Sequence, residues 1–234
     1  MKASFFTRFA SILTVLALWL AGTAYAAGIP ATLKVSYDFT KNIDVFKTNA
    51  SVATTSLTTE FKIDITSAAL GMNNYSSYGY CVELTQTISK GSYTFNLIDF
   101  ANDDFFKAAW VMDQFAPKRP NSWTAELQNQ AAAVQGLIWE LTGNISSVAS
   151  TTTASIYTYY TDYKAKLNQV KWDGEDAISL RSYLNSNYMF ATNAQYQDLL
   201  VKVDPVPEPA TLLLFGSGML GLAGLRLRRK FQAK

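Results

Sequence analysis

Thr32-Leu33-Lys34-Val35-Ser36-Tyr37-Asp38-Phe39-Thr40 alternates apolar and polar side chains without interruption. A period of two with one apolar face is typical of a strand in a half-buried antiparallel sheet. The same alternation recurs at residues 60–66, 80–85 and 92–99. Lys90-Gly91 supplies a turn between the last two stretches, which predicts that they form a hairpin. The first half of the chain is therefore expected to be antiparallel sheet.

Helical periodicity replaces this alternation in the middle of the chain. Asp103 or Asp104 can cap a helix that runs to about Phe115, before Pro117. A second helix is expected to start after Thr124. Its apolar stripe recurs at steps of four and three, as Leu127, Ala131, Val134, Ile138 and Leu141, and Gly143 fits its C-terminal end.

The last part of the chain mixes weaker patterns. Residues 146–155 are rich in Ser and Thr and suggest a loop, and residues 156–170 carry a Tyr-rich helical pattern. The stretch 176–190 fits a helix or a strand, and residues 198–203 fit a final strand. The sequence thus predicts one globular α+β domain over residues 27–204. We expect an antiparallel sheet, barrel-like or sandwich-like, with an inserted helical part.

The N-terminus has the pattern of an export signal. Lys2 and Arg8 precede an apolar stretch over residues 12–20, and Ala24-Tyr25-Ala26 places small residues where signal peptidase cuts. Residues 1–26 are therefore predicted to be a signal peptide that is removed after Ala26. Signal peptidase is accordingly an expected partner during processing.

The C-terminal tail has three parts in a fixed order. Val206-Pro207-Glu208-Pro209 is followed by an uncharged apolar run over 210–225 and by a basic cluster of Arg226, Arg228, Arg229 and Lys230. This tail, residues 205–230, resembles the PEP-CTERM sorting signal of Gram-negative bacteria. The resemblance implies a transmembrane helix, recognition of Pro207, Glu208 and Pro209 by an exosortase, and transient anchoring in the inner membrane. The expected destination is the cell surface or the extracellular matrix.

Composition excludes several classes of function. Residues 27–209 keep 13 basic side chains against 18 acidic ones, a net charge of −5, so a nucleic-acid partner is not expected. The chain contains no histidine, which excludes Ser-His-Asp triads and most zinc sites. No cofactor and no metal is expected.

One cysteine and one glutamine are the candidate site residues. Cys81 is the single cysteine of an exported chain, so it cannot form an internal disulfide. Alternation places Cys81 on the face opposite Tyr80, where a second layer can cover it. Gln135 lies beside the apolar stripe of the second helix, among small residues that let another backbone approach. We therefore expect Gln135 to face the strand that carries Cys81.

Three segments carry a resemblance to bacterial thioester domains. They are Gly79-Tyr80-Cys81-Val82-Glu83-Leu84, Ala108-Ala109-Trp110-Val111-Met112-Asp113-Gln114-Phe115-Ala116-Pro117 and Ala133-Val134-Gln135-Gly136-Leu137-Ile138-Trp139-Glu140. The resemblance implies a covalent bond between Cys81 Sγ and Gln135 Cδ. An amine or hydroxyl of a partner would attack that bond and become linked to Gln135. Tyr80, Trp110 and Trp139 are the expected shield against water.

The leading hypothesis is thus a covalent adhesin or matrix cross-linker, which is not an enzyme. A second hypothesis is a non-covalent structural or carbohydrate-associated protein of a biofilm matrix, which would display aromatic residues such as Tyr75, Tyr78 and those within 157–163. A third is a hydrolase with paired carboxylates, drawn from Asp103, Asp104, Asp173, Glu175 and Asp176.

Overall fold

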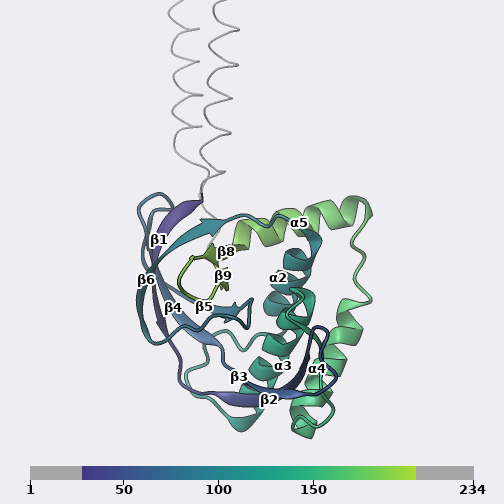
Figure 1. The fold of residues 1–234 in the computed structure, drawn as a ribbon. Helices are drawn as coiled ribbons and strands as arrows, with labels where there is room; N and C mark the ends of the chain where they lie inside the picture. The colour runs from purple at the N-terminus through teal and green to yellow at the C-terminus, as the bar shows by residue number, and fades with distance from the viewer. Residues whose placement is uncertain (1–27, 204–234) are drawn as a thin grey trace, which may run out of the picture. The chain divides into compact units, whose positions relative to one another are not determined.

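The computed structural model describes residues 28–203, which form the ribbon of Figure 1. The predicted signal peptide and the predicted transmembrane helix lie outside the described residues. The described part is a mixed structure of antiparallel sheets and helices, as the sequence indicated.

Six antiparallel strands close into a barrel. Their order around it is β1 (Ile29–Ser36), β4 (Phe61–Ser67), β5 (Met72–Cys81), β9 (Leu199–Lys202), β8 (Tyr188–Thr192) and β6 (Gly91–Ile98). Closure pairs β1 with β6, so the first and last strands of the described chain belong to one barrel. The apolar residues that alternate along β1 and β4 are buried, which confirms the predicted sheet face.

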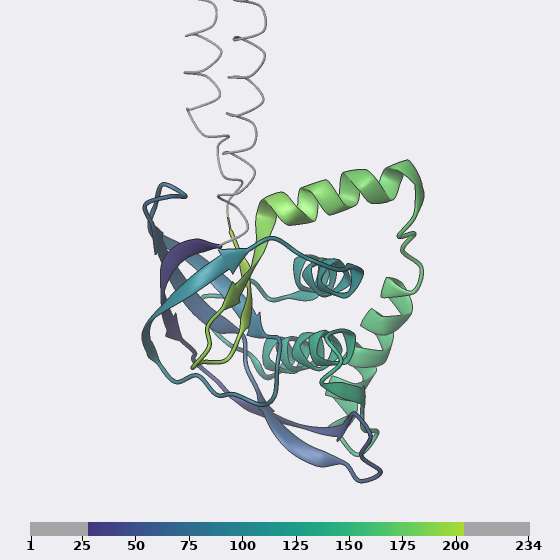
Figure 2. The same ribbon diagram turned by 45° about the horizontal axis from the view of Figure 1, so that its top comes forward.

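A smaller sheet and four helices complete the described part of the chain. The sheet has the order β3 (Thr54–Thr58), β2 (Lys41–Lys47) and β7 (Ile145–Val148). The helices are α2 (Asp103–Phe115), α3 (Ala125–Leu141), α4 (Ala154–Leu167) and α5 (Gly174–Asn187). Figure 2 shows the helices on one side of the barrel, and α3 packs against α2, α4, the small sheet and β5. Helix α3 is therefore the element at the centre of the domain.

The two predicted central helices are confirmed, with one change of cap. Helix α3 begins after Thr124, whose hydroxyl accepts a hydrogen bond from the Leu127 N–H at 3.2 Å. Helix α2 begins after Asn102, whose side chain accepts from the Phe105 N–H at 3.1 Å. Asp103 and Asp104 follow in the first turn, where their negative charge interacts favourably with the helix dipole, but neither side chain caps the helix.

The predicted hairpin across Lys90-Gly91 is wrong. Strand β5 ends at Cys81 and pairs with β4 and β9, whereas β6 pairs with β1 and β8. The alternation at 82–85 resembles a strand, but the backbone there binds polar side chains and a loop carbonyl instead of a ladder partner. Alternation within a short stretch of sequence cannot show whether the backbone pairs with a neighbouring strand or with side chains and loops.

Two other stretches differ from their predictions. The Ser/Thr-rich loop expected at 146–155 contains strand β7, which joins the edge of the small sheet beside β2. The ambiguous stretch 176–190 is both kinds of element, because α5 ends at Asn187 and β8 begins at Tyr188.

Gly136 allows α3 to lie close to the small sheet. A Cβ at this position would lie 2.7 Å from Val148 Cγ2 and 3.3 Å from Ile43 Cδ1, and both neighbours are buried. We expect Gly136→Ala to lower the free energy of unfolding, because overpacking costs about 1–3 kcal/mol and the gain in helix propensity is about 1 kcal/mol. Urea denaturation measures the difference. A variant as stable as the parent would show that the movement of Val148 and Ile43 costs no more than the gain in helix propensity.

Candidate functional site

Cys81 and Gln135 meet through two hydrogen bonds. The Cys81 N–H donates to Gln135 Oε1 at 3.0 Å, and Gln135 Nε2 donates to the Cys81 carbonyl at 2.7 Å. Gln135 is fully buried and Cys81 is 6% exposed. The side-chain amide thus pairs with the backbone of Cys81 much as a neighbouring strand would. The structure brings the two sequence-predicted residues together across β5 and α3.

Polar contacts fix the backbone that follows Cys81. The Val82 N–H donates to the Asp198 carbonyl at 3.1 Å. The Val82 carbonyl accepts from Thr142 Oγ1 at 2.8 Å and from Asn144 Nδ2 at 2.6 Å, and both residues follow α3. The end of β5 is therefore held from two sides, by the approach to β9 and by the C-terminal end of α3. Such a fixed scaffold limits how far Cys81 can move relative to Gln135.

The thiol of Cys81 is buried and carries its proton. Burial raises the pKa of the Cys81 thiol well above its ordinary value, and the nearby Glu83 carboxylate adds to the rise. The thiol is free, and no disulfide involves it. At neutral pH this group is accordingly a neutral thiol, so any reaction at Sγ has to provide a destination for the thiol proton.

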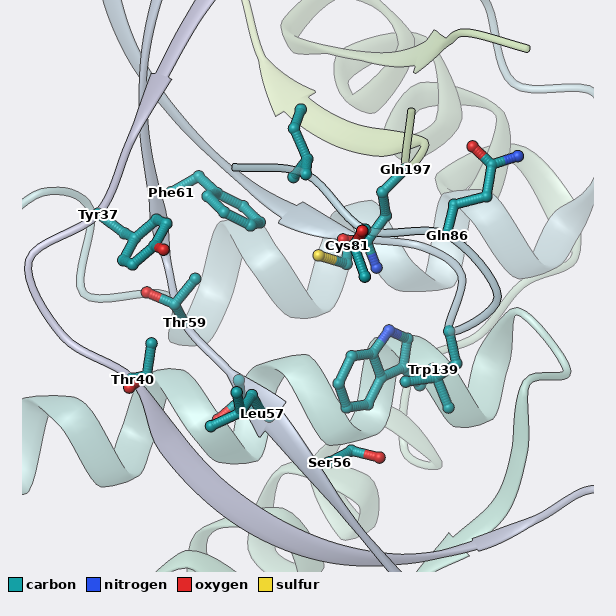
Figure 3. A pocket seen from close by; sticks show the side chains of 14 residues that line it. Tyr37, Thr40, Ser56, Leu57, Thr59, Phe61, Cys81, Gln86, Trp139 and Gln197 are labelled. Carbon is teal, nitrogen blue, oxygen red and sulfur yellow. The ribbon is translucent and has the colours of Figure 1, made fainter. Parts of the chain in front are cut away.

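A cavity of about 290 Å³ lies against Cys81. Figure 3 shows Sγ pointing into it, toward the side formed by Thr59 and Phe61. Trp139 of α3 and Gln197 of the segment before β9 line the cavity next to Cys81. The cavity places the thiol where a small molecule can reach it.

The three predicted shielding residues occupy different places. Trp139 is 1% exposed and lines the cavity with Cys81. Tyr80 is fully buried, but it does not line the cavity, and its hydroxyl donates to Glu60 Oε2 at 2.8 Å. Trp110 lies on α2, packs edge to face against Phe115, and does not line the cavity either. Among the three, Trp139 is the residue placed to cover Cys81.

Glu60 forms a buried cluster that the sequence did not indicate. Besides the Tyr80 hydroxyl, its carboxylate accepts the N–H groups of Lys118 at 3.2 Å and Arg119 at 2.6 Å. Both of those residues have positive φ angles, 63° and 58°. Burial raises the pKa of Glu60, and the hydrogen bonds from Arg119, Tyr80 and Lys118 oppose that rise. The cluster ties the loop between α2 and α3 to the strand that carries Cys81.

Some residues of the two other hypotheses have structural partners. Tyr78 is buried with its hydroxyl 3.3 Å from that of Tyr188, and Tyr163 is buried and stacks on Phe115. Asp103 is paired with Arg181. Within residues 28–203 there is no group of three or more acidic or cysteine side chains suited to a metal ion. Tyr78, Tyr163 and Asp103 are therefore part of the packing and ion pairing of the fold, whereas Asp173, Glu175 and Asp176 are exposed.

Several residues at the cavity were missed by sequence reasoning. Gln197 donates to the Glu83 carbonyl from the cavity wall, and Thr59 donates to the Phe39 carbonyl at 2.7 Å. Both lie outside regular elements, so no periodicity marks them. Both also stand among polar neighbours in the sequence, so polarity does not mark them either.

Comparison with known families identifies the tail of the chain. Residues 205–230 match the PEP-CTERM protein-sorting motif, which confirms the predicted sorting signal. The motif suggests an exported protein that is sorted by an exosortase to the cell surface or the extracellular space. No curated protein and no solved structure gives a significant match to the chain. Among the described helices, α2 to α5, none has the length and hydropathy needed to cross a bilayer.

Proposed function

We propose that this exported protein forms a thioester between Cys81 Sγ and Gln135 Cδ and uses it to bind a surface or matrix partner covalently. The observation that carries the proposal is the pair of hydrogen bonds between the Gln135 amide and the backbone of Cys81. They hold the amide carbon beside the one cysteine of the chain. The resemblance of the Cys81 and Gln135 segments to bacterial thioester domains supports the same assignment.

Formation of the thioester needs no external base, because the departing nitrogen takes the thiol proton. Sγ attacks Cδ, the bond between Cδ and Nε2 breaks, and the thiol proton passes to the departing nitrogen, which leaves as ammonia. The Cys81 N–H already donates to Oε1, where negative charge develops during the attack. Gln135 is fully buried, which limits access of water to Cδ from the helix side, whereas Sγ faces the cavity.

When the thioester captures a partner, the sulfur of Cys81 is the leaving group. An amine or hydroxyl of the partner bonds to Cδ, the bond to Sγ breaks, and the nucleophile's proton passes to Sγ. The raised pKa of the Cys81 thiol favours this protonated product. Each molecule reacts once and stays attached, so the protein acts as an adhesin or cross-linker and not as an enzyme.

Processing precedes display of the site. Signal peptidase would remove residues 1–26 during export, and the tail would anchor the chain in the inner membrane until an exosortase acts at Pro207, Glu208 and Pro209. Residues 27–204 would then reach the cell surface or matrix. The barrel and all four described helices lie within this portion, so the site does not depend on the tail.

Intact mass of exported residues 27–204 tests the proposal. We expect the parent to weigh less than its sequence predicts by one ammonia, and Cys81→Ala to show no deficit. Methylamine should add its whole mass at Gln135, so that the product is heavier than its sequence predicts by one CH2 group, and Cys81 should become available to alkylation after unfolding. A parent of full mass, with a thiol that alkylates fully once the chain is unfolded, would overturn the thioester.

A further inference from the structure

The indole N–H of Trp139 has no partner in the described structure. Trp139 is 1% exposed, and its Nε1 is buried without a hydrogen bond. Figure 3 places this nitrogen on the ring edge that faces Cys81 and Gln197 across the cavity. A buried donor without an acceptor costs about 1–3 kcal/mol. A ligand oxygen in the cavity would remove that cost.

The cavity wall carries no charge. Its side chains are hydroxyls, amides, aromatic rings, aliphatic groups and the neutral thiol of Cys81, and none of them is Lys, Arg, Asp or Glu. Lys90 Nζ lies 4.7 Å from the ring centre of Tyr37, one of the lining residues, so this wall has a cation behind it. An ammonium group would meet repulsion there and no carboxylate on the wall. A neutral ligand with several hydroxyls suits these surroundings, because each hydroxyl both donates and accepts.

The size and openness of the cavity suit one small unit of a larger molecule. Its volume of about 290 Å³ lies at the lower end of the range for small-molecule pockets. Leu57 lines it and is 66% exposed, so the cavity reaches the surface beside β3. The rings of Tyr37 and Phe61, 6.0 Å apart and edge to face, offer apolar surface to the carbon face of a sugar ring.

We propose that this cavity binds a neutral sugar unit, with Trp139 Nε1–H donating to one of its oxygens. The recognition is non-covalent and does not require the thioester. Where the sugar is also taken as the partner that is captured covalently, the inference rests on the proposed function. There the bound hydroxyl oxygen would bond to Gln135 Cδ, the bond from Cδ to Sγ would break, and the hydroxyl proton would pass to Sγ.

Binding is measured on residues 27–204 carrying Cys81→Ala, which cannot form the thioester. The probes are glucose, galactose, mannose and N-acetylglucosamine, with glucosamine and glucuronic acid as charged counterparts, and titration is followed by calorimetry and by the NMR signals of the indole N–H groups. We expect at least one neutral sugar to bind and to shift the Trp139 signal. Glucosamine, whose ammonium would meet the positive charge of Lys90, should bind at least tenfold more weakly.

Two tryptophan substitutions separate the donor from the ring. Trp139→Phe keeps an aromatic ring but removes the N–H, and it should weaken binding at least tenfold. Trp123→Phe is the matched control, because Trp123 Nε1 is also buried without a partner but lies outside the cavity, where its ring packs on Phe39. Binding by this control should equal that of the parent. Thermal melting checks that both variants fold.

Two sets of results would overturn the sugar site. Absence of binding by all four neutral sugars is one. Equal binding by Trp139→Phe, or preference for the charged counterparts, is the other. Because these experiments use Cys81→Ala, their failure leaves the mass deficit of the parent untouched. A missing mass deficit would in turn leave sugar binding intact.

Discussion

Replacing Gln135 by alanine is expected to lower the free energy of unfolding by about 3–5 kcal/mol, from two buried groups at 1–3 kcal/mol each and the space left by the side chain. The substitution removes the acceptor of the Cys81 N–H and the donor to the Cys81 carbonyl. Both groups lose their partner inside the domain, because Gln135 is fully buried. The comparison belongs in the Cys81→Ala background, where no thioester adds to stability. Urea denaturation of residues 27–204 measures it.

Gln135→Glu supplies a matched control for this expectation. A protonated carboxyl can accept from the residue 81 N–H and donate to the residue 81 carbonyl, whereas a carboxylate would oppose that carbonyl. Burial should raise the pKa of this carboxyl above its unfolded value of about 4.3. Its contribution to stability is then present below the unfolded pKa and lost as pH rises through the folded pKa. A Gln135→Ala variant as stable as its parent would show that the two hydrogen bonds contribute nothing.

Structural features that depend on residues close together in the chain were predicted well from the sequence. Helix α3 has its cap, its apolar stripe and its terminal Gly143 within one continuous segment, and the structure follows that pattern. The approach of Gln135 to Cys81 followed from the small residues around Gln135 and from the alternation at Tyr80. The first inference needed only neighbouring residues, whereas the second joined two segments 54 residues apart, each recognised by its own local pattern.

Features that depend on distant segments were not predictable in the same way. Strand β5 stops at Cys81 because Asp198, Thr142 and Asn144 take over its backbone hydrogen bonds, and these lie 60 residues or more along the chain. Strand β3 is polar and has no alternation, so its pairing with β2 decides its structure. Long-range partners of this kind leave no mark in a short window of sequence.

Glu60 shows the same limit at a single residue. Alternation along 60–66 puts Glu60 on the polar face of a strand, where a carboxylate is ordinarily solvated. The loop between α2 and α3 instead folds over it and presents the N–H groups of Lys118 and Arg119. Its partner Tyr80 immediately precedes Cys81. The cluster therefore links the loop to the candidate site.

Glu60→Ala is expected to lower the free energy of unfolding at neutral pH by about 2–4 kcal/mol, because three donors lose their acceptor at about 1–3 kcal/mol each and relief of backbone strain offsets part of that loss. The substitution leaves the Tyr80 hydroxyl and two backbone N–H groups without their acceptor. Release of Lys118 and Arg119 from their positive φ angles, each of which costs of order 1–3 kcal/mol, offsets part of this loss. Urea denaturation of residues 27–204 gives the difference.

Asp64→Ala is the control for the loss of an acidic partner of the same loop. Asp64 pairs with Arg119 at 3.2 Å, but its side chain is 32% exposed, so its removal should cost under about 1 kcal/mol. Equal effects of the two substitutions would show that burial of Glu60 adds nothing to its role.

The pH dependence of the free energy of unfolding shows which protonation state of Glu60 stabilises the fold. Because burial raises the pKa of Glu60, its contribution is greatest below the unfolded value and declines as pH rises through the folded pKa. The stability difference between the parent and Glu60→Ala should therefore be larger near pH 4 than at pH 7. Since Tyr80 adjoins Cys81, the variant should also expose the thiol to faster alkylation when no thioester is present. A difference that grows with pH, with unchanged alkylation, would mean that the carboxylate is the favoured form and that the cluster does not hold the site.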